Sequence, residues 1–284
     1  MHDDATTAGE GGDGQPPLPF EAARVYARTV EGWAREPLPE DVVARRGLAY
    51  GTHPAQRVDV YAPRAVRAAP VLVFWHGGGW TNGYREWVAF MAPHVVRRGM
   101  VLVAPSYRLV HEARLPAACD DAAAVLPFVR EHAAQWGADT QRLYLSGHSA
   151  GGHLAALTAL RTGGVRGCLP VSAILDLHHP APPPGSLEER VYTTVLADPD
   201  DDTVLSPLHW TRGNTVPFSL TVGEADSERV RRSNRRMAAL LRLQPAPCEL
   251  VVEAGLDHFA THTALADGDH PWYGRLQRLV DATG

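Results

Sequence analysis

The stretch Leu145–His153, LSGHSAGGH, combines two serines, two histidines and three glycines. An apolar run at 142–145 (RLYL) precedes it, and an apolar helical pattern at 149–160 follows it. The central G-x-S-x-G places Ser149 at the expected turn from strand to helix, where such a serine is held in a strained conformation with its Oγ exposed. The stretch therefore predicts a nucleophilic centre, with an ordinary glycine-rich turn as the alternative.

A second glycine stretch, HGGGW at 76–80, directly follows the apolar run Pro70–Trp75. Consecutive glycines cost backbone entropy on folding. A chain carries that cost where its backbone must approach a ligand closely, although a flexible loop is the alternative interpretation. We expect the amides of Gly78 and Gly79, together with that of Ala150, to form an oxyanion hole.

A serine nucleophile needs a base, and the base needs an acid that orients it. The usual chain order on such a sheet is serine, then acid, then histidine. The strand patterns FSLTV and ELVVE are followed by GEADS and AGLDHF, at the strand ends where open α/β sheets bind ligands. We predict that Asp226 is the acid and His258 the base. Glu224 and, more distantly, Asp176 are alternative acids, whereas Asp257 is too close in sequence to orient the ring of its neighbour.

Strand patterns alternate with helical patterns along most of the chain, which predicts an α/β fold with a mainly parallel, twisted sheet and helices on both faces. The expected strands are 57–61, 70–75, 100–104, 142–145, 168–175, 218–222 and 249–253. The expected helices are 20–33, 86–98, 117–135, 149–160, 226–243 and 272–281.

The domain organisation follows from composition. Residues 1–19 are acidic and rich in Gly, Pro and Thr, so we expect a disordered tail. Residues 20–284 are expected to form one domain. Within it, residues 20–45 and 177–214 are the expected cap elements, because the second segment is rich in Pro and His and too long for an ordinary connection.

Composition also limits the function classes. The net charge is −5 and no concentrated Lys/Arg run is present, which argues against a nucleic-acid partner. We expect no membrane span and no secretory signal, and hence a cytoplasmic protein. The three cysteines are widely spaced and give no disulfide framework. The oligomeric state cannot be read from the sequence, and a homodimer is one possibility.

Fourteen histidines raise the question of a metal site. His258 and His262 are four apart and His178 has a histidine neighbour, but no H-E-x-x-H is present, so we expect no metal. The P-loop and dinucleotide fingerprints are also absent, and we expect no cofactor. Trp80 and His148 are the expected pocket residues.

The motifs HGGGW, GHSAGG, GEADS and DHF, in that order, resemble the hormone-sensitive-lipase-like branch of the α/β-hydrolase superfamily over most of residues 45–284. Five stretches also resemble the arylformamidase (kynurenine formamidase) group: SGHSAGGHLAA, SAILDL, LSPLHW, VGEADSE and DHFATHTAL. The resemblance implies an α/β-hydrolase fold with Ser149, Asp226 and His258 as triad. Formamidases often carry an aromatic residue where this chain has Gly79, whereas esterases carry the third glycine.

These observations together predict a serine hydrolase that cleaves a small carboxylic ester, or an N-formyl or aryl amide, through an acyl-enzyme. An arylformamidase acting on N-formylkynurenine is the alternative substrate assignment. A catalytically silent ligand-binding protein on a hydrolase fold is the alternative of a different class, because a fold does not fix a function.

Overall fold

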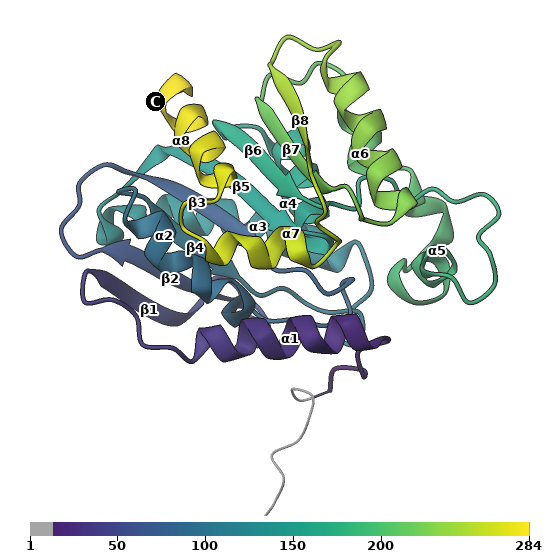
Figure 1. Ribbon diagram of the computed structural model, residues 1–284, viewed down its shortest axis with the longest axis horizontal. Coiled ribbons are helices and arrows are strands. Elements are labelled where there is room, and N and C mark those ends of the chain that lie inside the picture. The colour runs from purple at the N-terminus through teal and green to yellow at the C-terminus, as the bar shows by residue number, and fades with distance from the viewer. Residues whose placement is uncertain (1–13, 284) are drawn as a thin grey trace, which may run out of the picture.

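Eight strands form a single sheet in the computed structural model, which describes residues 14–283 (Figure 1). The strands are β1 (Val42–Ala49), β2 (Arg57–Pro63), β3 (Ala69–Trp75), β4 (Val101–Pro105), β5 (Ala138–His148), β6 (Gly167–Val171), β7 (Phe218–Gly223) and β8 (Cys248–Glu253). Their spatial order is β1-β2-β4-β3-β5-β6-β7-β8. β2 runs antiparallel to both of its neighbours, β1 and β4, and the strands from β3 to β8 are mutually parallel.

Helices cover both faces of the sheet (Figure 1). The α-helices are α1 (Glu21–Ala34), α2 (Ala92–Val96), α3 (Ala117–His132), α4 (Ala150–Thr162), α5 (Leu187–Arg190), α6 (Glu228–Leu241), α7 (Ala260–Thr263) and α8 (Pro271–Thr283). Short 3-10 helices are η1 (Arg85–Met91), η2 (Ala133–Trp136), η4 (Pro199–Asp202), η5 (Pro207–Trp210) and η6 (Ala264–Ala266), and η3 (Val191–Val195) is a π-helix. The predicted α/β fold with a mainly parallel sheet is confirmed.

The central strand β3 shows how the sheet divides the core. Val71, Val73 and Trp75 belong to the apolar cluster shared with α3, α4 and α6. Leu72 and Phe74 belong to the opposite cluster, which includes side chains of α1, η1, α2 and α8. Successive side chains of a strand point to opposite faces, so a strand buried on both faces is apolar at every position, as this one is.

Three sequence-based boundaries differ from the structure. The segment 86–98 is not one helix but η1 followed by α2. The strand predicted at 168–175 ends at Val171, because Ser172 has a φ of 46° and leaves the extended conformation. Strand β1 was missed and partly assigned to a cap. Its sequence VVARRGLA lacks alternation, and it is an edge strand whose register shifts between Arg45 and Leu48.

The N-terminal segment touches the domain. Residues 1–13 of the predicted tail lie outside the described residues. Gln15 accepts a hydrogen bond from the amide of Gly83 (2.9 Å) and donates one to its carbonyl (3.2 Å), and the carbonyl of Pro16 accepts one from Asn82 (2.6 Å). The packed part of the chain therefore begins before residue 20, unlike the prediction, because these polar groups fix the segment beside the glycine loop. None of the helices between residues 14 and 283 is long and apolar enough to cross a bilayer.

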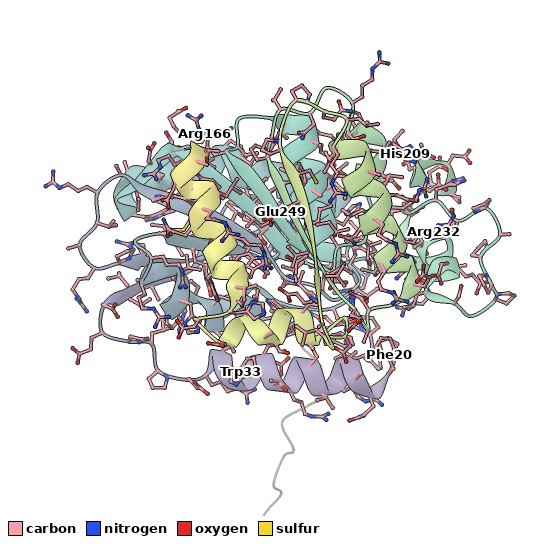
Figure 2. All side chains as sticks on the ribbon, turned by 45° about the horizontal axis from the view of Figure 1, so that its top comes forward. Phe20, Trp33, Arg166, His209, Arg232 and Glu249 are labelled. Carbon is pink, nitrogen blue, oxygen red and sulfur yellow. The ribbon has the colours of Figure 1, made fainter. Side chains whose placement is uncertain are left out.

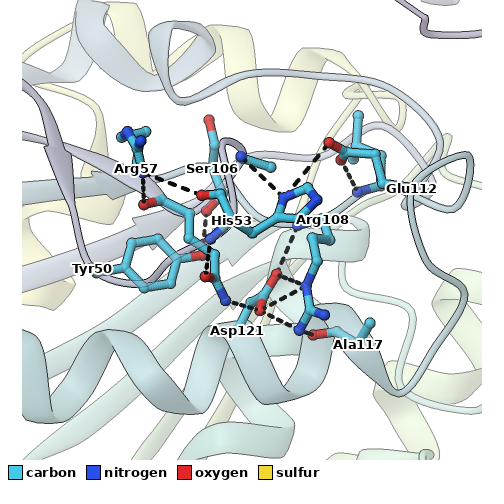
Figure 3. A network of polar contacts seen from close by, with 11 residues as sticks. Tyr50, His53, Arg57, Ser106, Arg108, Glu112, Ala117 and Asp121 are labelled. Atoms are coloured by element: carbon cyan, nitrogen blue, oxygen red, sulfur yellow. Dashed lines mark hydrogen bonds and ion pairs between the residues drawn. The ribbon is translucent and has the colours of Figure 1, made fainter.

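A buried ionic network fixes the loop after β4 (Figure 3). The carboxylate of Asp121 on α3 accepts bonds from the Arg108 guanidinium (2.7 Å), the Arg108 amide (2.8 Å) and Gln56 (2.7 Å). The intervening Tyr107 donates its hydroxyl proton to the carbonyl of His76 (3.1 Å). Because Tyr107 is next to Arg108 in the chain, the network also fixes the position of His76, at the start of the glycine loop.

Candidate active site

Ser149 stands at a sharp turn between β5 and α4. Its backbone has φ 55° and ψ −115°, a strained conformation for a residue with a side chain. A Cβ on Gly147 would meet the backbone of Gly151, and one on Gly151 would meet the carbonyl of Trp75. The two glycines of the motif are therefore required by close backbone approach, and the serine is presented at the carboxyl end of the sheet.

The structure brings the three predicted triad residues together. His258 Nε2 lies 2.8 Å from Ser149 Oγ, and His258 Nδ1 lies 2.9 Å from Asp226 Oδ1. The Asp226 side chain is fully buried, whereas 26% of the His258 side chain is exposed. Asp226 Oδ1 also accepts the amide of Ser227 (2.8 Å). This is the order nucleophile, base and orienting acid that acyl transfer requires.

The alternative acids have other partners. Glu224 Oε2 accepts the amide of Gly255 (2.9 Å) on an exposed turn, and Asp176 pairs with Arg236. Asp257 Oδ1 accepts amides at the start of α7 (3.0 and 2.8 Å). None of these three carboxylates forms a hydrogen bond to the His258 ring, so the geometry favours Asp226.

The glycine loop faces the serine with unused amides. Gly78 has a φ of 115°, and a Cβ there would meet the carbonyl of Asn82. Its own carbonyl accepts the amides of Thr81 (3.1 Å) and Asn82 (3.0 Å). The amides of Gly78 and Gly79 have no acceptor among residues 14–283. Ala150 is the first residue of α4, whose first-turn amides have no partner within the helix.

His76 directly precedes the glycine loop, and two contacts fix its ring. Its ring stacks on Tyr107 with centroids 4.4 Å apart, and its Nδ1 donates to the carbonyl of Gly77 (2.7 Å). Burial lowers the pKa of His76 to about 4, with a smaller contribution in the same direction from Arg85. The imidazole is therefore neutral near pH 7 and acts as a fixed hydrogen-bond donor.

A cavity of about 830 Å³, including its mouth, opens in front of Ser149. Trp80 and His148, the predicted pocket residues, both line it. Other lining residues come from α1, α5, η3, α6 and the loop before α7, and sequence reasoning did not assign them individually: Phe20, Ala23, Tyr26, Leu187, Arg190, Val191, Val195, Arg229 and Phe259. Most of these residues lie in the predicted cap segments 20–45 and 177–214. The unusual length of the second segment was therefore the one feature of the sequence that pointed to this part of the cavity wall.

His148 has a second contact besides the cavity. Its Nε2 donates to the carbonyl of His258 (2.7 Å), and its ring stacks on His262 with centroids 5.0 Å apart. His262 Nδ1 accepts the hydroxyl of Tyr26 (2.8 Å). Burial lowers the pKa of His148 well below its usual value, and the neighbouring histidines add to this. The neutral His148 ring thus links the loop that carries His258 to the turn between β5 and α4.

No three His, Cys, Asp or Glu side chains converge to hold a metal ion within the part of the chain that the structure describes. His178 pairs instead with Asp202 (2.8 Å), and His153 Nε2 donates to the carbonyl of Leu205 (2.7 Å). The site thus consists of side chains and backbone amides suited to acid–base and nucleophilic chemistry.

Comparisons with known proteins find esterases among the relatives of this chain. The BD-FAE family model matches residues 58–169. The probable isoprenylcysteine alpha-carbonyl methylesterase ICMEL1 of Arabidopsis thaliana is 35% identical over 115 residues, which are 40% of this chain and 24% of that protein. Carboxylesterase NlhH of Mycobacterium tuberculosis is 38% identical over 141 residues, 49% of this chain and 44% of that protein. The chain therefore matches less than half the length of these curated relatives.

A likeness to solved structures extends over the whole fold. A hyperthermophilic esterase from the archaeon Pyrobaculum calidifontis superimposes with a TM-score of 0.76 at 22% identity, covering 93% of this chain and 95% of that one. At this identity the likeness concerns the fold. It covers far more of the chain than residues 58–169, which the family model matches.

Proposed function

We propose that this chain, whose fold is that of the α/β-hydrolases, hydrolyses small carboxylic esters through an acyl-enzyme on Ser149. One observation carries the proposal: the continuous hydrogen-bonded array from Ser149 Oγ through the His258 ring to Asp226, at the floor of a cavity. The esterases named among the relatives support the same reaction class.

In the first half of the reaction, His258 Nε2 accepts the proton of Ser149 Oγ as that oxygen attacks the substrate carbonyl carbon. The carbonyl oxygen gains negative charge, which the amides of Gly78, Gly79 and Ala150 stabilise. The positive N-terminal end of α4 adds to this stabilisation. His258 then gives its proton to the leaving alcohol as the carbon–oxygen bond breaks.

In the second half, water replaces the alcohol. His258 takes a proton from the water, whose oxygen attacks the acyl carbon, and then returns a proton to Ser149 Oγ as the acid leaves. Asp226 is buried and holds Nδ1 of the ring, which fixes the tautomer and stabilises the imidazolium formed in each half. No metal or organic cofactor takes part in these steps.

A covalent probe tests the nucleophile. Treatment with a p-nitrophenyl alkylphosphonate should give one adduct by intact-protein mass spectrometry, located on Ser149 in the peptide map, because only an activated serine reacts readily. Ser149→Ala should abolish it, and Ser146→Ala, the matched control three residues earlier, should retain it. An unlabelled wild-type protein would favour the silent ligand-binding alternative.

The substrate assignment has a second candidate, arylformamidase, because aromatic side chains of Phe20, Tyr26 and Phe259 line the cavity and would accept an aryl group. Parallel measurement of kcat/KM on p-nitrophenyl butyrate and N-formylkynurenine separates the two. We expect the ester to be preferred, since the loop carries a third glycine at position 79. A strong preference for the formamide would reverse the assignment.

A further inference from the structure

Two arginines, Arg190 and Arg229, line the cavity beside Ser149, and no aspartate or glutamate lines it among residues 14–283. Hydrolysis of a neutral ester makes no use of a cationic wall. Arginine is also costly to bury unless it is paired. The acyl-transfer steps therefore leave the presence of these two arginines in the cavity wall unexplained.

Arg229 is held in the first turn of α6, and 14% of its side chain is exposed. Its nearest carboxylate is Glu188, with Nε 3.4 Å from Oε1, and its guanidinium makes no hydrogen bond within the described residues. Burial lowers the pKa of Arg229, although Glu188 and Asp226 oppose this. A guanidinium offers five N–H donors, so most of its hydrogen-bonding capacity is unused.

Arg190 ends α5, on the same side of the cavity. It is partly exposed, and its guanidinium has neither an ion pair nor a hydrogen bond within the described part of the chain. Glu188 therefore pairs with only one of the two guanidiniums, that of Arg229, and no carboxylate in the described residues lies within ion-pair distance of Arg190. Asp226 adds a more distant negative charge, which opposes the effect of burial on Arg229 but forms no hydrogen bond with its guanidinium.

The remaining cavity wall near α1 is aromatic. The Phe259 ring lies 5.0 Å from that of Tyr26 and 6.0 Å from that of Phe20, measured between centroids. Figure 1 shows α1 along the lower edge of the molecule and α5 at the right, on the side of the N-terminal end of α1, where Figure 2 labels Phe20. The cavity therefore has an aromatic side next to α1, and its two guanidiniums stand among the aliphatic side chains of α5 and η3 and at the start of α6.

We propose that the preferred ester substrates carry a carboxylate, bound by Arg190 and Arg229, while their apolar part packs against the aromatic side of the cavity. Arginine suits this role because its planar fork matches a carboxylate with two parallel hydrogen bonds. The proposal rests on the esterase function above and adds a substrate class to it.

Paired substrates test the acyl side. The mono-p-nitrophenyl ester of glutaric acid carries a terminal carboxylate, and p-nitrophenyl valerate is its neutral counterpart of similar length. We expect the ratio of kcat/KM for the anionic to the neutral ester to fall at least tenfold in Arg190→Gln and in Arg229→Gln, about 1.4 kcal/mol of lost discrimination. Arg232→Gln on the exposed face of α6 (Figure 2) is the matched control and should leave the ratio unchanged.

A second pair, 4-carboxyphenyl butyrate and phenyl butyrate, places the carboxylate on the leaving-group side. A loss of selectivity in this pair alone assigns the arginines to the leaving group, and a loss in the first pair alone assigns them to the acyl group. In both cases about 0.5 M NaCl should reduce the wild-type preference, since salt screens exposed charges. Ratios that stay constant across both pairs in both variants would overturn the proposal.

A binding measurement separates this proposal from the esterase function. Trp80 and Trp87 line the cavity, so tryptophan fluorescence can follow 4-phenylbutyrate and its neutral amide without any turnover. We expect the carboxylate to bind at least tenfold more tightly to the wild type, and the difference to disappear in the Arg190→Gln/Arg229→Gln protein. Equal binding of acid and amide would refute the anion site even if esters are cleaved, and a retained difference would support it even if they are not.

Discussion

At the scale of single residues, the site depends on where one imidazole is held. His258 is fixed from three directions: its Nδ1 by Asp226, its Nε2 by Ser149, and its carbonyl by His148. The first two contacts set its tautomer, and the third sets the position of its backbone. A proton acceptor with so few degrees of freedom is already oriented for transfer before substrate arrives.

Asp226 is the residue whose replacement tests this arrangement. Asp226→Asn should lower kcat on an activated ester by about 10⁴-fold, because the amide favours the wrong imidazole tautomer. Glu224→Gln, the matched control two residues away, should change kcat less than about threefold, since its side chain is exposed and can still accept the Gly255 amide. A large loss in the control with little loss in the first variant would transfer the role of acid to Glu224.

At the scale of elements, the loop from Ser106 to Leu109 contacts both helix α3 of the core and the glycine loop of the site. Asp121 on α3 binds Arg108, and the adjacent Tyr107 supports the carbonyl of His76 (Figure 3). A buried charge that loses its partner is strongly destabilising, because it remains desolvated without compensation.

We expect Asp121→Asn to lower the free energy of unfolding by about 2 kcal/mol, measured by urea denaturation, because it weakens charge-assisted hydrogen bonds while Arg108, whose side chain is 27% exposed, stays partly hydrated. Asp120→Asn, one residue earlier on the exposed side of α3, is the control and should change it by less than about 0.5 kcal/mol. Equal effects of the two substitutions would show that the network contributes nothing specific.

Several elements could be predicted from the sequence because one physical signal defined each. β3 is apolar throughout since both its faces are buried, and the β5–α4 turn carries glycines where backbones nearly touch. β1 could not be predicted, because an edge strand with a register shift needs no alternation. The arginines of the cavity wall could not be predicted either, since Arg190 and Arg229 reach the same cavity only through the tertiary packing of α5 and α6.

At the scale of the whole molecule, four buried histidines make stability depend on pH. Burial lowers the pKa of His76 and His153 to about 4 and that of His262 to about 3, and that of His148 also falls well below its usual value. The unfolded chain binds protons near pH 6.5, whereas the folded chain does not until far lower pH. Stability is therefore complete above pH 6.5 and is lost as pH falls toward 4.

The expected loss at pH 5 is about 2 kcal/mol for each of His76, His153 and His262, so Tm should fall by more than about 10 °C between pH 7 and pH 5. Calorimetry on the wild type measures this slope. His153→Gln keeps a donor toward Leu205 but removes one titrating group, and should reduce the slope by about a quarter of the histidine contribution. A Tm that is flat over this range, or a variant slope equal to that of the wild type, would show that the histidines do not titrate as inferred.

The attack of Ser149 on the ester carbonyl is tested by measuring kcat/KM of Ser149→Ala on p-nitrophenyl butyrate, with folding checked by circular dichroism. We expect kcat/KM to fall by at least about 10³-fold, leaving only the residual catalysis that an oxyanion hole and substrate binding provide. A folded Ser149→Ala protein that keeps a substantial fraction of wild-type turnover would contradict it.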